Sequence, residues 1–302
     1  MPRTIQHLAE YGLAGTLLGI VDVLPLPIAV SAARGLGRLW YRVDARRRRV
    51  AVDNVVRAGI APSAAQAALI ARASFEHFAV LLAESLKSRR AFNRPDWRDR
   101  IEWGIPPELE AILEEPGRGV LLASGHLGNW ETAAQLLSRT KPVVGVTRRM
   151  NNPYVERLIR KRKPTGAFTL TPKRSADSGR FLRALKEGKI LALLIDQHAP
   201  RGRIQVNFFG RPCTSYTAIA LLHLVTQAPL CFGYCVRTGL MRFRFKATGP
   251  LSHPRTGDKE RDVREILESL NRELEEAVRA YPEQYLWAHR RWRGERPAPG
   301  PS

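Results

Sequence analysis

The stretch "LLASGHLGNWETA", residues 121–133, places a histidine and a carboxylate where they could act together on a substrate. His126 follows an apolar run and a Ser-Gly turn, and Glu131 comes five residues later, inside a predicted helix. A carboxylate beside an imidazole fixes its tautomer and stabilises the imidazolium that forms when the ring accepts a proton. We therefore expect His126 to act as a general base and Glu131 to orient it.

The substrate itself is expected to supply the nucleophile. No Gly-x-Ser-x-Gly sequence is present, so the chain carries no recognisable serine nucleophile elbow. A base without such a partner would activate a hydroxyl group of the substrate, without a covalent enzyme intermediate. Backbone N–H groups at the start of the helix are candidates to hold the developing oxyanion. Taken by itself, the His-x4-Glu spacing also fits a core histidine with an incidental ion pair.

Alternating strands and helices are predicted around this motif, and they indicate an α/β fold with a mixed, partly parallel central sheet flanked by helices. Ligands of such sheets collect where strands end and helices begin, which is where His126 lies. Ser63 is expected to cap one of the helices. The predicted strands are 118–126, 141–149, 168–173, 189–197, 229–237 and 242–250, and the predicted helical segments are 45–95, 131–139, 151–163, 178–188, 216–228 and 262–287.

The overall charge points to an anionic partner. The 302 residues include 49 Lys and Arg but only 28 Asp and Glu, which gives a net charge of +21. Nucleic acid and anionic lipid are the obvious partners for such a surplus, and arginine-rich codon usage is the alternative explanation. The three cysteines show no metal-binding spacing, and we expect free thiols in a reducing compartment. We expect no metal site and no resident cofactor.

The N-terminal segment is predicted to lie on or in a membrane. Residues 11–30 are almost wholly apolar, but Asp22, Pro25 and Pro27 interrupt them, so we expect a helix that dips into one leaflet rather than one that spans. Trp40, Tyr41 and the arginines at 46–49 are typical of an anionic bilayer surface. A helix buried in the protein core is the alternative. We divide the chain into a membrane-associated helical segment at 1–45, a main domain at 46–294 and a disordered tail at 295–302.

Four further blocks of sequence extend the His-x4-Glu motif into a family resemblance. The five blocks together are "SGHLGNWE", "VTRRMNNPYVERLI", "LALLIDQHAPRGRIQVNFFGRPCTS", "PEQYLWAHRRWR" and the N-terminal "RRRRVAVDNV". In this order they resemble the bacterial lipid A biosynthesis acyltransferases, the lauroyl and myristoyl transferase group, to which phosphatidylinositol mannoside acyltransferases are related. Cys213 departs from the expected pattern in the third block.

The resemblance implies a glycerolipid-acyltransferase-like fold and a membrane-associated acyltransferase at the cytoplasmic face of the inner membrane. The donor would be an acyl thioester on acyl carrier protein or coenzyme A, and the acceptor a hydroxyl of a lipid A precursor-type anionic glycolipid. His126 and Glu131 would be catalytic. The residues implied in substrate binding are Arg148, Asp196, Asn129 and Arg149, with Asp196 bridging either to His126 or to Arg148.

Other basic and polar groups have weaker support. His198 and His289 are possible site residues, although packing roles explain them as well. The cations at 157 and 160–163 could grip lipid phosphates or an acidic carrier protein, or form a solvated helix face. Acylation of a phosphatidylinositol mannoside or a lysophospholipid from acyl coenzyme A is the second functional hypothesis. A nucleic-acid-binding protein is a remote third, because no reading motif is present and the apolar N-terminus argues against it. A non-catalytic membrane scaffold is the fourth.

Overall fold

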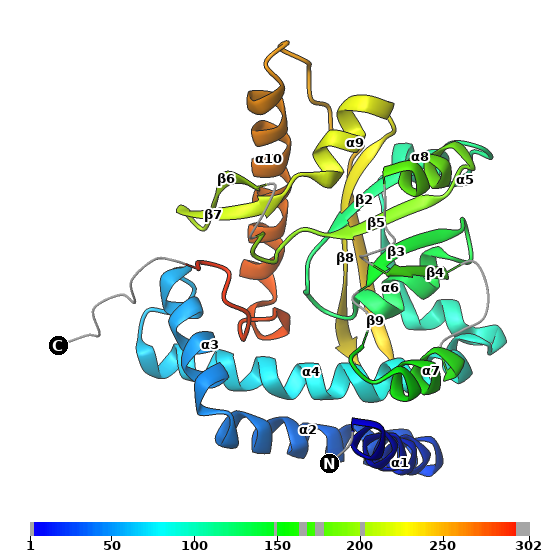
Figure 1. Ribbon diagram of the computed structural model, residues 1–302, viewed down its shortest axis with the longest axis vertical. Helices are drawn as coiled ribbons and strands as arrows, with labels where there is room; N and C mark the ends of the chain where they lie inside the picture. The colour runs from blue at the N-terminus through cyan, green and yellow to red at the C-terminus, as the bar shows by residue number, and fades with distance from the viewer. Residues whose placement is uncertain (1–2, 148–149, 163–167, 173–177, 200–202, 294–302) are drawn as a thin grey trace.

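A computed structural model describes residues 3–147, 150–162, 168–172, 178–199 and 203–293, and Figure 1 shows the course of the chain. The α-helices are α1 (Arg3–Val23), α2 (Leu26–Val43), α3 (Ala45–Arg57), α4 (Ala64–Phe92), α5 (Pro107–Glu114), α6 (Trp130–Leu137), α7 (Pro153–Arg162), α8 (Ser178–Lys186), α9 (Ala218–Thr226) and α10 (Lys259–Ala280). Short 3-10 helices cover Pro95–Arg100 (η1) and Pro282–Gln284 (η3).

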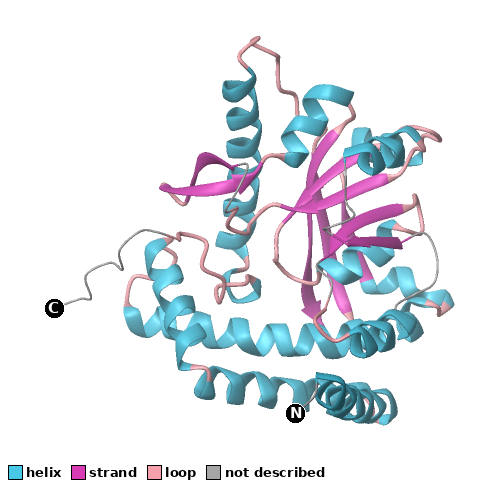
Figure 2. Cartoon of the chain, in the orientation of Figure 1, coloured by secondary structure: helices cyan, strands magenta, loops and turns pink. Residues whose placement is uncertain are grey.

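The strands form a seven-stranded sheet and a separate hairpin. They are β1 (Ile101–Gly104), β2 (Val120–Ser124), β3 (Val143–Thr147), β4 (Phe168–Pro172), β5 (Ile190–Leu194), β6 (Arg203–Phe208), β7 (Arg211–Tyr216), β8 (Leu230–Gly239) and β9 (Arg242–Thr248). The sheet order is β1-β9-β8-β2-β5-β3-β4, and only the β8–β9 pairing is antiparallel. The α/β class and the mixed, mostly parallel sheet flanked by helices are therefore confirmed, and Figure 2 shows this layering.

Two apolar clusters cover the two faces of the sheet. On one face, α9 and α10 pack with β2 and with the buried sides of α3 and α4. On the other face, α5 and α6 pack against β1, β8 and β9. The strand β2 is buried along its whole length, as expected for a central parallel strand that is covered on both sides. This burial fixes the place where the chain leaves β2 at Ser124, two residues before His126.

Several elements differ from the sequence prediction. The strand β1, the helix α5 and the β6–β7 hairpin were not predicted. The long C-terminal helix ends at Ala280 rather than near residue 287, because Pro282 follows and the chain turns there into η3 and an extended segment. The helix α4 begins at Ala64, and Gln66 donates its backbone N–H to Ser63 Oγ, as the predicted N-cap requires. The predicted tail lies outside the described residues.

The N-terminal apolar run forms two helices that break at Leu24 and Pro25, not one. Among the described residues, none of the helices combines the length and the apolar character needed to cross a bilayer. The core-helix alternative is wrong for α1, because none of its described side chains is buried. Its large apolar side chains are instead exposed, namely Ile5, Leu8, Tyr11, Leu13, Leu17, Ile20 and Val23.

Trp40 and Tyr41 are partly buried against α4. Both rings pack against Phe75 of α4, with ring centroids 4.5 and 5.4 Å from it. The guanidinium of Arg47 lies over the Trp40 ring, and that of Arg48 lies over Tyr41. These two partly buried residues therefore join α2 and α3 to the core, and their interfacial role stays a prediction.

Candidate active site

The imidazole of His126 is held by Asp196, which follows the neighbouring strand. Ser124 of β2 pairs with Leu194 of β5, so both chains leave the sheet side by side. The Nδ1 of His126 lies 2.8 Å from Oδ1 of Asp196, and the His126 backbone N–H donates to Oδ2 at 2.8 Å. With Nδ1–H bonded to a carboxylate, the lone pair belongs to Nε2. The geometry therefore fits a general base whose acceptor nitrogen is Nε2.

Nearby positive charge and hydrogen bonds keep Asp196 ionised although it is buried. Its side chain is 3% exposed, and burial alone would raise its pKa. The charge of His126 and the hydrogen bonds from its ring and backbone act in the opposite direction, with help from Arg291, and the net pKa is lowered. Arg291 is itself held by Gln197 O, Thr214 O and Ser215 Oγ. Burial, and then the charge of Asp196, raises the pKa of the Tyr285 phenol well above its usual value.

The C-terminal block pairs with the loop that carries His126. Leu286 donates its backbone N–H to His126 O at 3.0 Å, and Gly128 donates to Gln284 O at 3.0 Å. Gly128 has φ +60°, and a Cβ there would lie 2.1 Å from the carbonyl oxygen of Cys235. No other residue fits this close approach to β8, so the glycine lets the loop turn back after the histidine.

Buried polar side chains of α3 and α4 hold this loop and the C-terminal segment that pairs with it. His77 lies with Nε2 3.2 Å from Gly128 O, and burial lowers its pKa to about 4, so the ring is neutral and donates this hydrogen bond. Ser74 donates to Tyr285 O at 2.6 Å. Asn54 donates to both Trp287 O and His289 O at 2.7 Å. The C-terminal motif block thus holds the catalytic loop through backbone contacts, and Asn54 of the N-terminal block holds the C-terminal block through its side chain.

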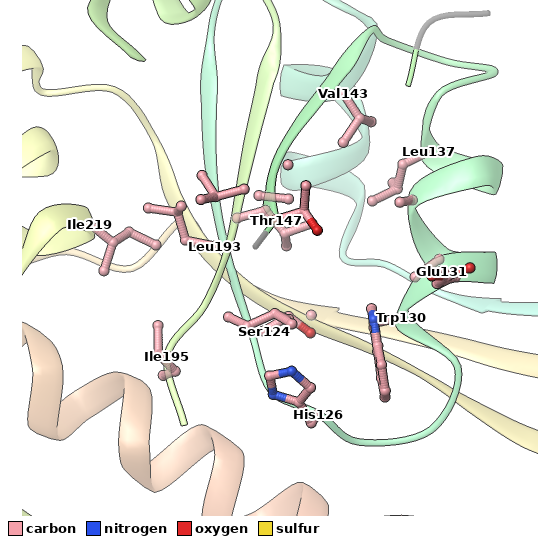
Figure 3. Close-up of a pocket in the computed structure, with 18 of the residues that line it drawn as sticks. Ser124, His126, Trp130, Glu131, Leu137, Val143, Thr147, Leu193, Ile195 and Ile219 are labelled. Atoms are coloured by element: carbon pink, nitrogen blue, oxygen red, sulfur yellow. The ribbon is translucent and has the colours of Figure 1, made fainter. Parts of the chain in front are cut away.

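Asp196 lies at Nδ1 of His126, where the sequence predicted Glu131, and Glu131 lines the cavity. The hydrogen bond at Nδ1 goes to Asp196, so the position expected for Glu131 is already filled. Because it is buried behind the ring, Asp196 does not fit a substrate contact, and its bridge to His126 is the one the structure contains. Glu131 lies in the first turn of α6 and lines the cavity described below, beyond Trp130 as seen from His126 (Figure 3).

Asn129 is a helix cap rather than a substrate contact. Its side chain is fully buried, and its Oδ1 accepts the backbone N–H of Thr132 at 2.9 Å. Ser85 of α4 donates to the same oxygen at 3.4 Å. The predicted substrate contact therefore does not fit this position. Arg148 and Arg149 lie outside the described residues.

An apolar cavity of about 650 Å³ opens beside the imidazole. His126, whose side chain is 15% exposed, lies at one end together with Trp130, at a ring-centroid distance of 4.9 Å. Figure 3 shows apolar side chains of β3, β5, α6 and α9 continuing from this end. They include Leu137, Val143, Leu193, Ile195 and Ile219. The volume lies within the roughly 300–1,000 Å³ that small-molecule sites occupy, and the lining suits an alkyl chain.

Gln197, which the sequence did not single out, lies next to the ring, and His198 and His289 contact each other nearby. Gln197 Nε2 is 3.3 Å from His126 Nε2. The backbone N–H of His198 donates to His289 Nε2 at 3.3 Å, and Nδ1 of His198 lies 3.0 Å from Thr214 Oγ1. Burial lowers the pKa of His289, which fits its role as an acceptor. The position of Gln197 directly after the motif aspartate was the only signal for it in the sequence.

The cysteines and the basic helix of the sequence analysis lie as follows. The three cysteines are free and buried, as predicted. Helix α7 is confirmed, and of its predicted basic face only the side chain of Arg157 is described, where it is exposed. The described residues contain no group of three or more His, Cys, Asp or Glu side chains arranged to hold a metal ion.

Comparison with known proteins agrees with the motif blocks. The family described as bacterial lipid A biosynthesis acyltransferase matches residues 3–294. The chain is 24% identical over 284 residues to the lipid A biosynthesis lauroyltransferase of Escherichia coli K12, covering 92% of this chain and 89% of that protein. It is 25% identical over 199 residues to the phosphatidylinositol mannoside acyltransferase of Mycobacterium tuberculosis, covering 64% and 60%. It is 23% identical over 182 residues to the protein of that name from Mycolicibacterium smegmatis, covering 59% and 58%.

The family match spans nearly the whole chain, including both the loop that carries the base and the distant segments that hold it in place. This chain therefore belongs to the bacterial lipid A biosynthesis acyltransferase family and is an acyltransferase.

Proposed function

We propose that this protein moves a fatty acyl chain from an acyl thioester to a hydroxyl group of a lipid A precursor-type glycolipid at the cytoplasmic face of the inner membrane. The thioester is carried by acyl carrier protein or coenzyme A. The observation that carries the proposal is the pairing of His126 with Asp196 at the end of an apolar cavity. A base with a fixed tautomer lies where an alkyl chain and a polar reacting group would meet.

In this mechanism, Nε2 of His126 accepts the proton of the acceptor hydroxyl as the oxygen attacks the thioester carbonyl carbon. The carbonyl oxygen becomes an oxyanion in the tetrahedral intermediate. When the intermediate collapses, the carbon–sulfur bond breaks, and the thiolate leaves with the proton returned from the imidazolium. Asp196 keeps Nδ1–H in place throughout and stabilises the imidazolium.

The cavity is proposed to bind the acyl chain of the donor. Its lining is mostly apolar and includes His126, so a bound acyl chain would have its thioester beside the base. We propose that Glu131 belongs to the substrate-binding wall, because it lines this cavity while Nδ1 of His126 is already bonded to Asp196. Arg148 and Arg149 follow β3, which lines the cavity, and are proposed to bind the anionic part of a substrate.

The N-terminal helices are proposed to lie in the membrane surface. The exposed apolar side chains of α1 continue on α2 with Ile28, Leu36, Leu39 and Val43. Exposed arginines follow at Arg42, Arg46 and Arg49, which suits an anionic bilayer. Asn152 ties α1 to the start of α7, since its side chain donates to His7 O and to Glu10 Oε2, each at 2.8 Å. We propose residues 1–45 as the membrane-associated segment of the protein and residues 46–294 as its acyltransferase domain.

A phosphatidylinositol mannoside is the second candidate acceptor. The similarity to two mycobacterial acyltransferases of that name favours it, although those matches cover less of the chain than the match to the lauroyltransferase. Both acceptors are anionic glycolipids with free hydroxyl groups, so the same base serves either reaction.

The decisive experiment compares wild type with His126→Ala, using lauroyl-coenzyme A or lauroyl-acyl carrier protein as donor and each glycolipid as acceptor. We expect transfer to one acceptor and its loss, by about 10³-fold or more, in the variant. The circular dichroism spectrum should be unchanged, because the ring is partly exposed at a cavity wall. Wild-type transfer by the folded variant would refute the proposal. Transfer to phosphatidylinositol mannoside alone would replace the first acceptor by the second.

A further inference from the structure

The side-chain amide of Gln197 contacts Nε2 of His126, the nitrogen that accepts the proton in the proposed reaction. Gln197 Nε2 lies 3.3 Å from His126 Nε2. Because Nδ1–H is bonded to Asp196, Nε2 of the ring is an acceptor, and the contact is a hydrogen bond donated by the Gln197 amide. In the free protein this bond caps the base, so an acceptor hydroxyl must displace the amide before it can lose its proton.

The Gln197 backbone is fixed while its side chain reaches into the cavity. Its carbonyl oxygen accepts a hydrogen bond from Arg291 Nη1 at 3.1 Å, and the preceding Asp196 is bonded twice to His126. The side chain is partly exposed and lines the same apolar cavity as the imidazole. When a hydroxyl displaces it, the amide can rotate only locally, so it stays beside the reacting atoms.

Four backbone N–H groups of the loop that carries His126 and of the start of α6 are already used within the protein. The backbone N–H groups of His126, Gly128, Asn129 and Thr132 donate to Asp196 Oδ2, Gln284 O, Cys235 O and Asn129 Oδ1, at 2.8, 3.0, 2.7 and 2.9 Å. Breaking any of these bonds would leave a buried acceptor unpaired and loosen the loop that carries the base. These four groups are therefore not available to an oxyanion, whereas substrate binding sets the Gln197 amide free to donate to one.

We propose that Gln197 is a catalytic residue of the acyl transfer. Its side-chain amide caps Nε2 of His126 in the free protein and donates to the thioester oxyanion once the acceptor hydroxyl has taken its place. The hydroxyl oxygen binds within hydrogen-bond distance of Nε2, and the oxyanion forms on the carbon that this oxygen attacks. An amide that starts 3.3 Å from Nε2 is thus within reach of it. Asn and Gln side chains supply such donors in other acyl-transfer enzymes.

This inference rests on the proposed function, and the experiment separates the two. Gln197→Ala, Gln197→Glu and His126→Ala are compared with wild type in lauroyl transfer, with Gln66→Ala and Gln66→Glu as matched controls at an exposed site on α4. Loss of one oxyanion donor lowers kcat by about 10²–10³-fold in the best-studied cases, and we expect a fall of about 10²-fold in Gln197→Ala. The KM values for both substrates should change by less than about threefold, because the hydrogen bond from the Gln197 amide to the oxyanion forms only in the transition state.

Gln197→Glu adds a readout that a structural role would not move. A carboxylate of the same size beside Nε2 pairs with the imidazolium and favours the protonated ring. We expect the acidic limb of the kcat/KM profile to move to higher pH, and kcat at its optimum to be no higher than in Gln197→Ala. Neither change should occur in the Gln66 variants.

Each outcome has one meaning. Wild-type or increased kcat in Gln197→Ala, with His126→Ala inactive, would overturn the donor role and leave the proposed function standing. Transfer by folded His126→Ala would overturn the proposed function itself. A loss in Gln197→Ala that appears only as a raised KM would reduce Gln197 to a substrate contact and would also overturn the inference.

Discussion

Asp196→Asn tests whether Asp196 orients the base. The substitution keeps the size of the side chain but turns one acceptor oxygen into an NH₂ donor. The His126 backbone N–H needs an acceptor at the Oδ2 position, 2.8 Å away, and this N–H is fixed by the loop. The amide oxygen is therefore expected to sit there, which points the NH₂ group at Nδ1. A donor at Nδ1 forces the ring proton onto Nε2, and the base loses its lone pair.

The expected loss is large in activity and modest in stability. The corresponding substitution in the serine proteases leaves the geometry intact but lowers kcat about 10⁴-fold through the wrong tautomer. We expect a fall of about 10³–10⁴-fold here, or roughly 4–5.5 kcal/mol of activation free energy. The folded state loses a charge-assisted hydrogen bond at Nδ1, which costs about 1.5–3 kcal/mol of unfolding free energy. The variant should therefore fold and be nearly inactive.

The assay is thiol release from lauroyl-coenzyme A with acceptor present, together with nitrogen NMR of the His126 ring to read its tautomer. Asp262→Asn is the matched control, since this buried aspartate at the start of α10 accepts hydrogen bonds from Thr256 and is not among the residues that line the cavity. We expect normal transfer by the control. If folded Asp196→Asn kept more than about a tenth of the wild-type kcat, the tautomer argument would be refuted.

Two further predictions concern the membrane face and a buried carboxyl group. Replacing both Leu13 and Leu17 by Glu should weaken sedimentation with phosphatidylglycerol-containing vesicles at least tenfold, since each buried leucine contributes about 1.5–3 kcal/mol, whereas Val225→Glu on α9 should bind as wild type. Equal binding by all three proteins would contradict the proposed membrane face. Burial raises the pKa of Glu84 from 4.5 to about 7, so between these values the folded protein holds a proton that the unfolded chain has released, and stability falls by about 3 kcal/mol as pH rises through this window. Glu84→Gln should therefore unfold at higher denaturant concentration than wild type at pH 8 but not at pH 5, and an equal difference at both pH values would count against this explanation.

The sequence predicted the elements of the site better than their arrangement. The strands that became β2 and β5 were both predicted, but a single sequence does not show that they are neighbours. The register Ser124 with Leu194 brings His126 and Asp196 together, each two residues beyond the pair, across 70 positions of chain. The spacing of Glu131 was instead visible as a local motif. For this reason local spacing pointed to Glu131, whereas the strand register brings Asp196 to Nδ1 of His126.

The sequence also placed the end of the last helix too late in the chain. The amphipathic pattern of α10 continues in sequence beyond Ala280, where the helix ends. Pro282 ends the helix, and backbone groups of the residues that follow bond to His126 O and Gly128 N. This contact with a loop some 160 positions earlier is not visible in a single sequence. Likewise, Trp40 and Tyr41 are residue types typical of a membrane interface, and a single sequence does not show that both rings pack against Phe75 of α4.

The choice of Asp196 over Glu131 as the partner of His126 follows from rigidity. An aspartate has one fewer rotatable bond than a glutamate, and fixing a long charged side chain costs up to about 1.5–2 kcal/mol in rotamer entropy. Asp196 is held at both oxygens by one residue, through the backbone N–H and the ring nitrogen of His126, so the carboxylate and the imidazole are fixed together. Glu131 instead lies in the first turn of α6 and lines the cavity. The acid behind the ring can therefore preset the tautomer before substrate arrives, which leaves the cavity side of the imidazole to Gln197 and the substrates.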